Sequence, residues 1–178
     1  MAKSKSVPFA DVPPALAGYA GNQEFDPLNM TGYMDIKWMR EAELKHCRIC
    51  MLACIGWLIQ EVYQLPFYPG APANPVEAHA YMAGVYKPLG QVALWTSFFE
   101  IITIPAVIQM MTGESDRAAG DFGFDPLKIG GPDRMKYAEV ELINGRLAMC
   151  AIGGFIHQAW LTGKPAIAQL TSGPYIPL

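Results

Sequence analysis

The chain has 178 residues, of which 52% are hydrophobic and 16% are charged, and its net charge at pH 7 is −3. Soluble domains usually carry about 25% charged residues, so this composition and a mean hydropathy of +0.17 favour a membrane protein. The length fits a single domain covering residues 1–178. A slightly acidic chain has no basic footprint for nucleic acid, which excludes that class of partner.

The opening segment, MAKSKSVPFADVPP, lacks the apolar core of a secretory signal and predicts a flexible arm. Three later segments, 35–63, 89–111 and 132–161, are each long enough to cross a bilayer as a helix. Asp35 can cap the first helix, and Gly163 follows the third. The linkers are rich in Pro and Gly, and the tail after residue 163 is predicted to be irregular.

The first and third segments form an internal repeat. AELKHCRICM (42–51) and VELINGRLAM (140–149) share one plan, and FDPL precedes each of them, at 25–28 and 124–127. Two equivalent helices running in the same direction are therefore expected, related by a pseudo-two-fold axis along the membrane normal. The repeated polar positions are Glu43 and Glu141, His46 and Asn144, and Arg48 and Arg146.

The remaining basic residues predict the orientation. Nine of them would lie on one side of a three-span protein and two on the other, which places the N-terminus on the positive side. The nine are Lys3, Lys5, Lys37, Arg40, Lys45, Arg117, Lys128, Arg134 and Lys136, and the two are Lys87 and Lys164.

The charges inside the repeated helices need partners, because an unpaired ion inside a membrane costs several kcal/mol. Glu43 and Arg48 are five residues apart and do not stack on one helix. If the two helices cross, Glu43 can meet Arg146 and Glu141 can meet Arg48. Arginine can hold a carboxylate through two parallel hydrogen bonds. We therefore expect these two ion pairs.

Four cysteines lie in the apolar helical segments: Cys47, Cys50, Cys54 and Cys150. Cys47-x-x-Cys50 is compatible with a redox pair or, together with His46, with a metal site. We interpret the four as small residues that fill a tight helix interface.

Each repeated helix also offers isolated electron-pair donors. A carboxylate paired to arginine keeps a lone pair, and His46 or Asn144 follows three residues later. Such donors do not converge on one bare ion and suit several metal macrocycles with one axial ligand each, such as the magnesium of chlorophyll. The Asn144 amide NH2 is expected to bond the Glu141 carboxylate, which would orient the amide oxygen.

REAELKHCRICML and AEVELINGRLAM resemble the paired helix motifs of the light-harvesting chlorophyll-binding superfamily, and the resemblance covers nearly the whole chain after Ala17. It implies an all-α membrane protein with three transmembrane helices, the first and third parallel and crossed. It also implies a non-enzymatic antenna that binds chlorophyll a, chlorophyll c and carotenoids. The implied magnesium ligands are Glu43, His46, Glu100, Glu141, Asn144 and Gln158, and Gln60 and Gln91 are further candidates.

The short loops and the arm SKSVPFADVPPALAG resemble the red-lineage chlorophyll a/c type, including the dinoflagellate antennas whose xanthophyll is peridinin. The resemblance implies a multi-pass protein of the chloroplast thylakoid membrane with a stromal N-terminus. Its partners would be thylakoid lipids, a photosystem core and other antenna subunits.

Three other functions compete with light harvesting. A photoprotective, quenching member of the same superfamily would use the same ligands. A membrane di-iron carboxylate oxidase would use Glu-x-x-His twice, but the second copy has Asn144 in place of histidine. A small transporter would suit the buried charges but has few spans. His79 and His157 are interpreted as a surface and a structural histidine.

Overall fold

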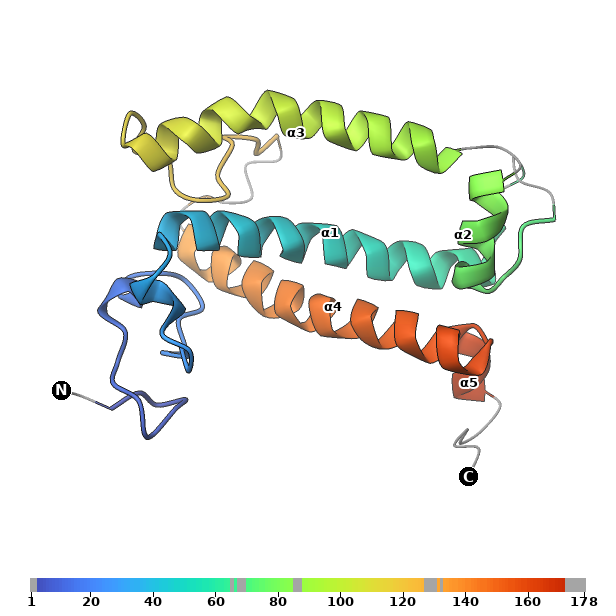
Figure 1. The fold of residues 1–178 in the computed structure, drawn as a ribbon, viewed down its shortest axis with the longest axis horizontal. Helices are drawn as coiled ribbons and strands as arrows, with labels where there is room; N and C mark the ends of the chain where they lie inside the picture. Colours follow the sequence, from blue (N-terminus) through green and yellow to red (C-terminus); the bar gives the residue numbers. More distant parts are fainter. Residues whose placement is uncertain are drawn as a thin grey trace. The chain divides into compact units, whose positions relative to one another are not determined.

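The computed structural model describes residues 3–64, 66, 70–84, 88–126, 131 and 133–171. The regular elements of this described part are helical, which confirms the all-α class (Figure 1). The long helices are α1 (Ile36–Val62), α3 (Pro88–Thr112) and α4 (Arg134–Thr162), and the short ones are α2 (Pro75–Gly84) and α5 (Ala166–Thr171). Two 3-10 turns, η1 (Pro14–Leu16) and η2 (Met30–Gly32), precede α1.

The long helices lie close to the predicted segments and end on the expected signals. The Asp35 side chain accepts a hydrogen bond from the Lys37 N–H at 2.7 Å and caps the start of α1. Gly113 and Gly163 adopt φ of +80° and +65° directly after α3 and α4, the left-handed conformation that stops a helix. The predicted start of the third helix, residue 132, lies outside the described residues.

The chain folds into two compact units, one of residues 1–48 and 105–146 and one of residues 49–104 and 147–178. Helices α1, α3 and α4 each contribute residues to both units. That all 178 residues form a single antenna domain stays a prediction.

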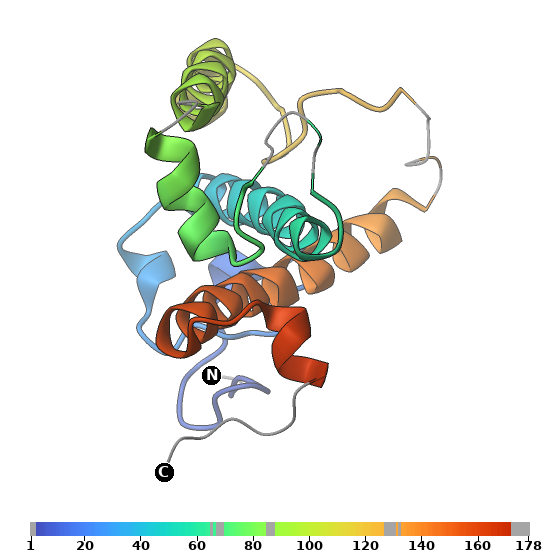
Figure 2. The same ribbon diagram turned by 90° about the vertical axis from the view of Figure 1, so that its right-hand side faces the viewer.

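In the first unit, α1 and α4 meet where Cys47 lies against Gly145, and their N-terminal ends diverge from there in the second view (Figures 1 and 2). Cys47 is buried at this contact, and the buried Leu44 and Leu142 lie against the loop glycines Gly120 and Gly21. This packing is consistent with two crossed helices.

The N-terminal arm of this unit is folded, so the expectation of a flexible arm is wrong. Lys3 Nζ lies 2.8 Å from Asp11 Oδ1, and the buried Ser4 hydroxyl donates to the Glu24 carbonyl at 2.6 Å. The same Ser4 oxygen accepts the Val7 N–H at 3.1 Å. Side chain–backbone bonds of this kind stabilise a turn that composition alone does not predict.

The second unit contains two helices that the sequence patterns did not predict. Helix α2 begins with Pro75 directly after Asn74, whose side-chain oxygen accepts the Val76 N–H at 3.1 Å. The Asn74 amide nitrogen also donates to the Gly163 carbonyl at 3.1 Å and links α2 to the end of α4.

Helix α5 corrects the prediction of an irregular tail for residues 166–171, whereas residues 172–178 lie outside the described part. The Glu61 carboxylate accepts the N–H groups of Ala166 at 2.8 Å and Ile167 at 2.7 Å. A six-residue helix gains most of its stability from such tertiary contacts. The glutamate that caps it lies more than 100 residues earlier, which is why local sequence did not reveal the helix.

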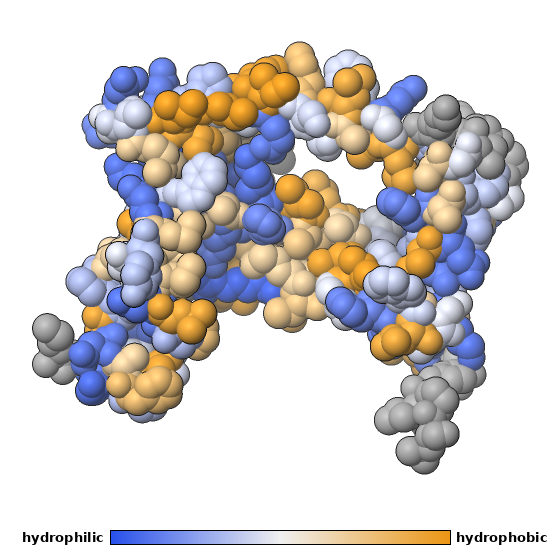
Figure 3. Space-filling view, in the orientation of Figure 1, coloured by the Kyte–Doolittle hydropathy of each residue, from blue (hydrophilic) through white to orange (hydrophobic). Residues whose placement is uncertain are grey.

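Within the described residues, α3 is the single helix that passes a length and hydropathy test for crossing a membrane, with a mean hydropathy of 1.5. Every side chain from residue 90 to residue 102 is exposed, and apolar side chains gather along this helix in Figure 3. Pro105 interrupts its hydrogen-bond ladder. Helices α1 and α4 carry the charged clusters of the repeat, which lower their hydropathy.

Candidate functional site: a reciprocal ion-pair clamp

Two ion pairs join α1 and α4 in the first unit, and their four side chains (Glu43, Arg48, Glu141 and Arg146) are called the clamp. Arg48 Nε lies 2.7 Å from Glu141 Oε1, and Arg146 Nε lies 2.8 Å from Glu43 Oε1. These are the combinations expected from the repeat. All four side chains are between 28% and 41% exposed in the protein alone. The two helices therefore neutralise each other's charges reciprocally.

Each arginine of this clamp also binds a loop. Arg48 donates to the Gly120 carbonyl at 2.8 Å, and Arg146 donates to the Gly21 carbonyl at 2.9 Å. The two glycines precede the two FDPL sequences by the same distance, and both have positive φ, +78° and +64°. The repeat thus extends from the helices to the loops before them, and each arginine joins a loop to both helices.

A small residue permits the helices to approach at this level. A Cβ added to Gly145 would lie 2.5 Å from Cys47 Sγ and 3.1 Å from its Cα, which is too close for any side chain. Cys47 is fully buried, as its interpretation as a packing residue requires, whereas Cys150 is exposed and does not fill the interface. Small residues at such crossings are typical of membrane helix pairs.

The two ion pairs of the clamp differ, because one of the two glutamates has a second cationic partner. Arg40 NH1 lies 2.6 Å from the second oxygen of Glu43, and its guanidinium also bonds the Ala20 carbonyl and lies over the Tyr19 ring. The equivalent place in the repeat is Ala138. Glu43 therefore has two arginine partners, and Glu141 has one among the described residues.

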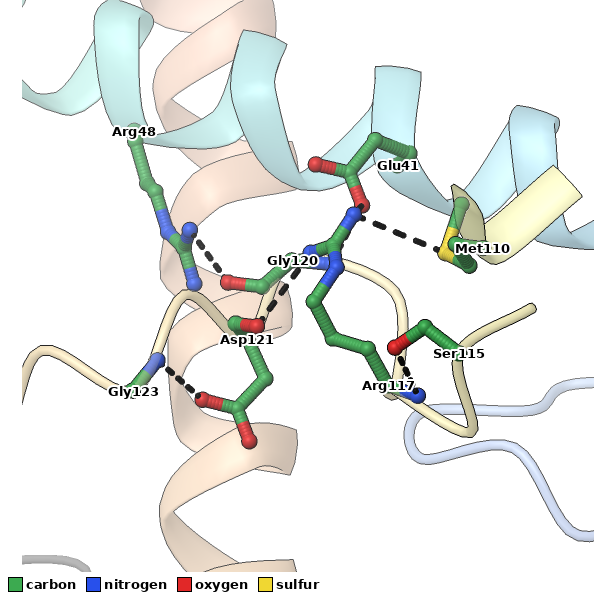
Figure 4. A network of polar contacts seen from close by, with 8 residues as sticks. All are labelled: Glu41, Arg48, Met110, Ser115, Arg117, Gly120, Asp121 and Gly123. Atoms are coloured by element: carbon green, nitrogen blue, oxygen red, sulfur yellow. Dashed lines mark hydrogen bonds and ion pairs between the residues drawn. The ribbon is translucent and has the colours of Figure 1, made fainter. Parts of the chain in front are cut away.

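A buried network beside the clamp was missed at the sequence level (Figure 4). Glu41, which is 3% exposed, accepts the Gly120 N–H at 2.6 Å and Arg117 NH2 at 3.1 Å. Arg117 also donates to the Asp121 carbonyl at 3.2 Å and lies 4.5 Å from the centre of the Phe122 ring. In the sequence, Arg117 contributes only to the count of basic residues that predicts the orientation, because its partner Glu41 is 76 residues away.

The two aspartates of these loops are held ionised. Burial tends to raise the pKa of Asp26, but bonds from the Thr31 hydroxyl and from the Thr31 and Met30 N–H groups outweigh it and lower the pKa. For Asp121, the Gly123 N–H bond is the largest effect and lowers the pKa, with the Arg134 guanidinium acting in the same direction.

His46 and Asn144, the expected nitrogen and oxygen donors, are exposed, and each has one polar side-chain atom bonded to a backbone carbonyl. His46 Nδ1 lies 2.7 Å from the Ala42 carbonyl oxygen. Because a carbonyl only accepts, this contact places a ring proton on Nδ1 and makes Nε2 the ring atom that can donate an electron pair. Asn144 donates its NH2 to the Val140 carbonyl at 2.9 Å, not to Glu141 as expected. The Glu141 carboxylate already binds Arg48, and the carbonyl four residues back is nearer in a helix.

The other candidate ligands lie in the second unit. Gln158 is exposed on α4, and its amide nitrogen donates to the buried Gln169 of α5. Glu100 and Gln91 are exposed on α3. The amide nitrogen of Gln60 is buried without a hydrogen-bond partner in the structure. The candidates are thus distributed along separate helix surfaces.

Two cavities of the first unit adjoin the clamp. One of about 1030 Å³ is lined by Arg48, Glu141 and the loop 118–122, and one of about 670 Å³ by Glu43, Arg146 and the loop 21–28. Each contains residues of one FDPL loop and one ion pair of the clamp. The repeat therefore produces two related cavities.

This donor set fits several large ligands better than one bare metal ion. In the described part, no group of three or more His, Cys, Asp and Glu side chains could hold a metal together. The paired glutamates of the repeat are neutralised by arginine, which disfavours a cationic di-iron centre. Isolated donors on exposed helix surfaces, among them His46 Nε2, match macrocycles that each need one axial ligand.

Comparison with known proteins agrees with this reading. The sequence pattern of the chlorophyll A-B binding protein family matches residues 12–160. A fucoxanthin-chlorophyll a-c binding protein of Chattonella marina var. antiqua is 39% identical over 154 residues, covering 81% of this chain and 67% of the relative. A protein of the same description from Isochrysis galbana is 33% identical over 155 residues, covering 79% and 73%.

Light-harvesting complex stress-related protein 1 of Chlamydomonas reinhardtii is 33% identical over 158 residues, covering 75% of this chain and 59% of the relative. Membership of the family is established by its sequence pattern, which spans most of the chain, and by the two fucoxanthin-chlorophyll a-c binding proteins, which are covered to two thirds or more of their length. The chain therefore belongs to the chlorophyll A-B binding protein family, and it is a light-harvesting, chlorophyll-binding antenna protein and not an enzyme.

Proposed function

We propose that the chain is a red-lineage antenna subunit that crosses the thylakoid membrane three times, through α1, α3 and α4. Helices α1 and α4 would be related by a pseudo-two-fold axis along the membrane normal, with the N-terminus on the stromal side. The clamp carries this proposal, because reciprocal Glu–Arg pairs make two charged helices acceptable in a bilayer. The chloroplastic relatives and the distribution of Lys and Arg support the location.

The residues that would hold chlorophyll magnesium are Glu43, His46, Glu100, Glu141, Asn144 and Gln158, with Gln60 and Gln91 as further candidates. When bound, chlorophyll supplies light absorption and excitation transfer. The chain's own part is to fix each axial donor in one orientation. The bonds of His46 to Ala42 and of Asn144 to Val140 do this, since they leave one ring nitrogen and one amide oxygen directed outward.

The two cavities beside the clamp would each receive one end of a carotenoid, at the two FDPL loops. The pigments would be chlorophyll a, chlorophyll c and a xanthophyll. The names of two relatives favour fucoxanthin, and the resemblance of the N-terminal arm to the dinoflagellate type favours peridinin. The excitation would pass to a photosystem core and to neighbouring antenna subunits in the lipid of the thylakoid.

The test is reconstitution of the apoprotein with chlorophylls a and c and with both xanthophylls, followed by chromatography of the bound pigments. His46→Leu should lose one chlorophyll per chain, and His46→Asn should keep it, because the amide oxygen is also a ligand of magnesium. An equal pigment count in His46→Leu would contradict the ligand assignment, and a wild-type chain that binds no chlorophyll c would contradict the chlorophyll a/c assignment.

A second candidate function is photoprotection, which the similarity to a stress-related light-harvesting protein favours. The two functions use the same ligands and differ in the fate of the excitation. The fluorescence lifetime of the reconstituted protein separates them: a lifetime of free-antenna length supports harvesting, and a strongly shortened one supports quenching.

A further inference from the structure

A second exposed histidine, His157 near the end of α4, has the same ring-to-backbone hydrogen bond as His46. Its Nδ1 lies 2.8 Å from the Gly153 carbonyl oxygen, four residues earlier. The carbonyl only accepts, so this contact places a ring proton on Nδ1 and makes Nε2 the ring atom that can donate an electron pair. We propose that His157 is the axial ligand of a further magnesium tetrapyrrole. This inference rests on the proposed function, since it needs a protein that binds chlorophyll.

His157 resembles His46 in its exposure and in the hydrogen bond of its ring. Both imidazoles are exposed on long helices, and both donate from Nδ1 to the carbonyl one turn back, at 2.7 Å and 2.8 Å. A ligand histidine usually has its second nitrogen bonded in this way, because that bond fixes the tautomer and the ring orientation. His157 therefore meets the requirement that His46 meets.

The helix surface beside His157 is open and bordered by apolar side chains. Helical side chains lean toward the N-terminus and cover the preceding turn. That turn contains Gly153 and Gly154, and nothing lies within 4 Å of a Cβ placed on either glycine. Exposed apolar side chains flank it, among them Ile156 (40%) and Trp160 (74%). A planar macrocycle can thus approach the backbone while its edges meet apolar groups.

This site is separate from the one assigned to Gln158. Consecutive residues of a helix with 3.6 residues per turn point about 100° apart. The Gln158 amide bonds Gln169 of α5, and Gln169 in turn donates to the Lys164 carbonyl at 2.8 Å. Gln158 is therefore turned toward α5, and the two side chains serve different surfaces.

The first test counts pigments in reconstituted variants. His157→Leu should bind one chlorophyll fewer than wild type, and His157→Asn should keep it. Gln158→Leu serves as the matched control at the next position: it should lose a different chlorophyll, so that the double variant loses two. Far-UV circular dichroism shows that each variant is folded. A wild-type count in folded His157→Leu overturns the inference and leaves the proposed function intact, whereas a wild-type chain without chlorophyll overturns both.

A second test needs no substitution. Diethyl pyrocarbonate modifies free imidazole nitrogen, and mass spectrometry of peptides reports each of the three histidines separately. In the pigment-loaded protein, the exposed His79 of α2 should react readily while His157 is protected, and pigment extraction should remove the protection. If His157 reacts as fast as His79 in the loaded protein, its Nε2 is free and the inference is wrong.

Discussion

Replacing Arg48 by leucine should destabilise the protein more than replacing Arg146, although the repeat makes the two arginines equivalent. Each makes one ion pair across the helices and one hydrogen bond to a glycine carbonyl, at nearly equal distances. What differs is the glutamate that each substitution leaves behind. Glu43 retains Arg40 at 2.6 Å, whereas Glu141 has no second cation among the described residues.

The magnitudes follow from that difference. Removing one partner of a buried pair and leaving the other charge uncompensated costs about 3–5 kcal/mol, and partial exposure places Arg48→Leu near the lower value. Arg146→Leu loses charge-assisted hydrogen bonds but leaves a paired carboxylate, which costs about 1.5–3 kcal/mol. At the lower end of the Arg146→Leu range the difference is about 1.5 kcal/mol, which corresponds to about 3–6 °C in the unfolding midpoint for a chain of this size.

The assay is the thermal loss of visible circular dichroism in the reconstituted protein, compared at one heating rate. The double variant Arg40→Leu, Arg146→Leu is the control, because it removes both partners of Glu43 and should fall to the Arg48→Leu value or below. Equal midpoints for the two single variants, or a lower midpoint for Arg146→Leu, would refute the idea that Arg40 makes the clamp asymmetric.

Three further predictions concern other contacts. Glu41→Gln should lower stability by about 1.5–3 kcal/mol, because Arg117 and the Gly120 N–H lose charge-assisted hydrogen bonds while Arg117 keeps the attraction of Asp121, and the loop 113–124 should then be cleaved faster in limited proteolysis. Gly145→Ala should prevent pigment assembly while Gly56→Ala does not, since only the first glycine faces a close neighbour; equal pigment yields would contradict this. The lowered pKa of Asp26 means that its stabilising effect is present above the ordinary value of 3.8 and is lost as pH falls below it. A pH titration of unfolding should lose this step in Asp26→Asn.

The ion pairs could be predicted because the repeat supplied a symmetry argument. Two helices with the same glutamate and arginine spacing, crossing in a medium that does not tolerate free charge, have few ways to pair their charges. The helix ends could be predicted for a different reason, because Asp35 and Gly163 act through local backbone chemistry.

Contacts between distant residues could not be predicted in the same way. Glu61 caps α5 across more than 100 positions, and Ser4 anchors the arm to Glu24 through side chain–backbone bonds. The Asn144 amide donates to the Val140 carbonyl and not to the Glu141 carboxylate, and residue spacing alone does not predict which of these two acceptors it bonds. In each case one hydrogen bond fixes a segment whose own sequence is compatible with several conformations.

The asymmetry of the clamp extends to its two loops. The Gly120 peptide is held on both sides, its N–H by Glu41 and its carbonyl by Arg48. At the other loop, Arg146 holds the Gly21 carbonyl, and the repeat-mate of Glu41, Glu139, is exposed. The cavities beside the two loops also differ, with volumes of about 1030 and 670 Å³. Two identical carotenoids placed there would meet different surroundings, so the repeat that makes the sites equivalent in position does not make them equivalent in energy.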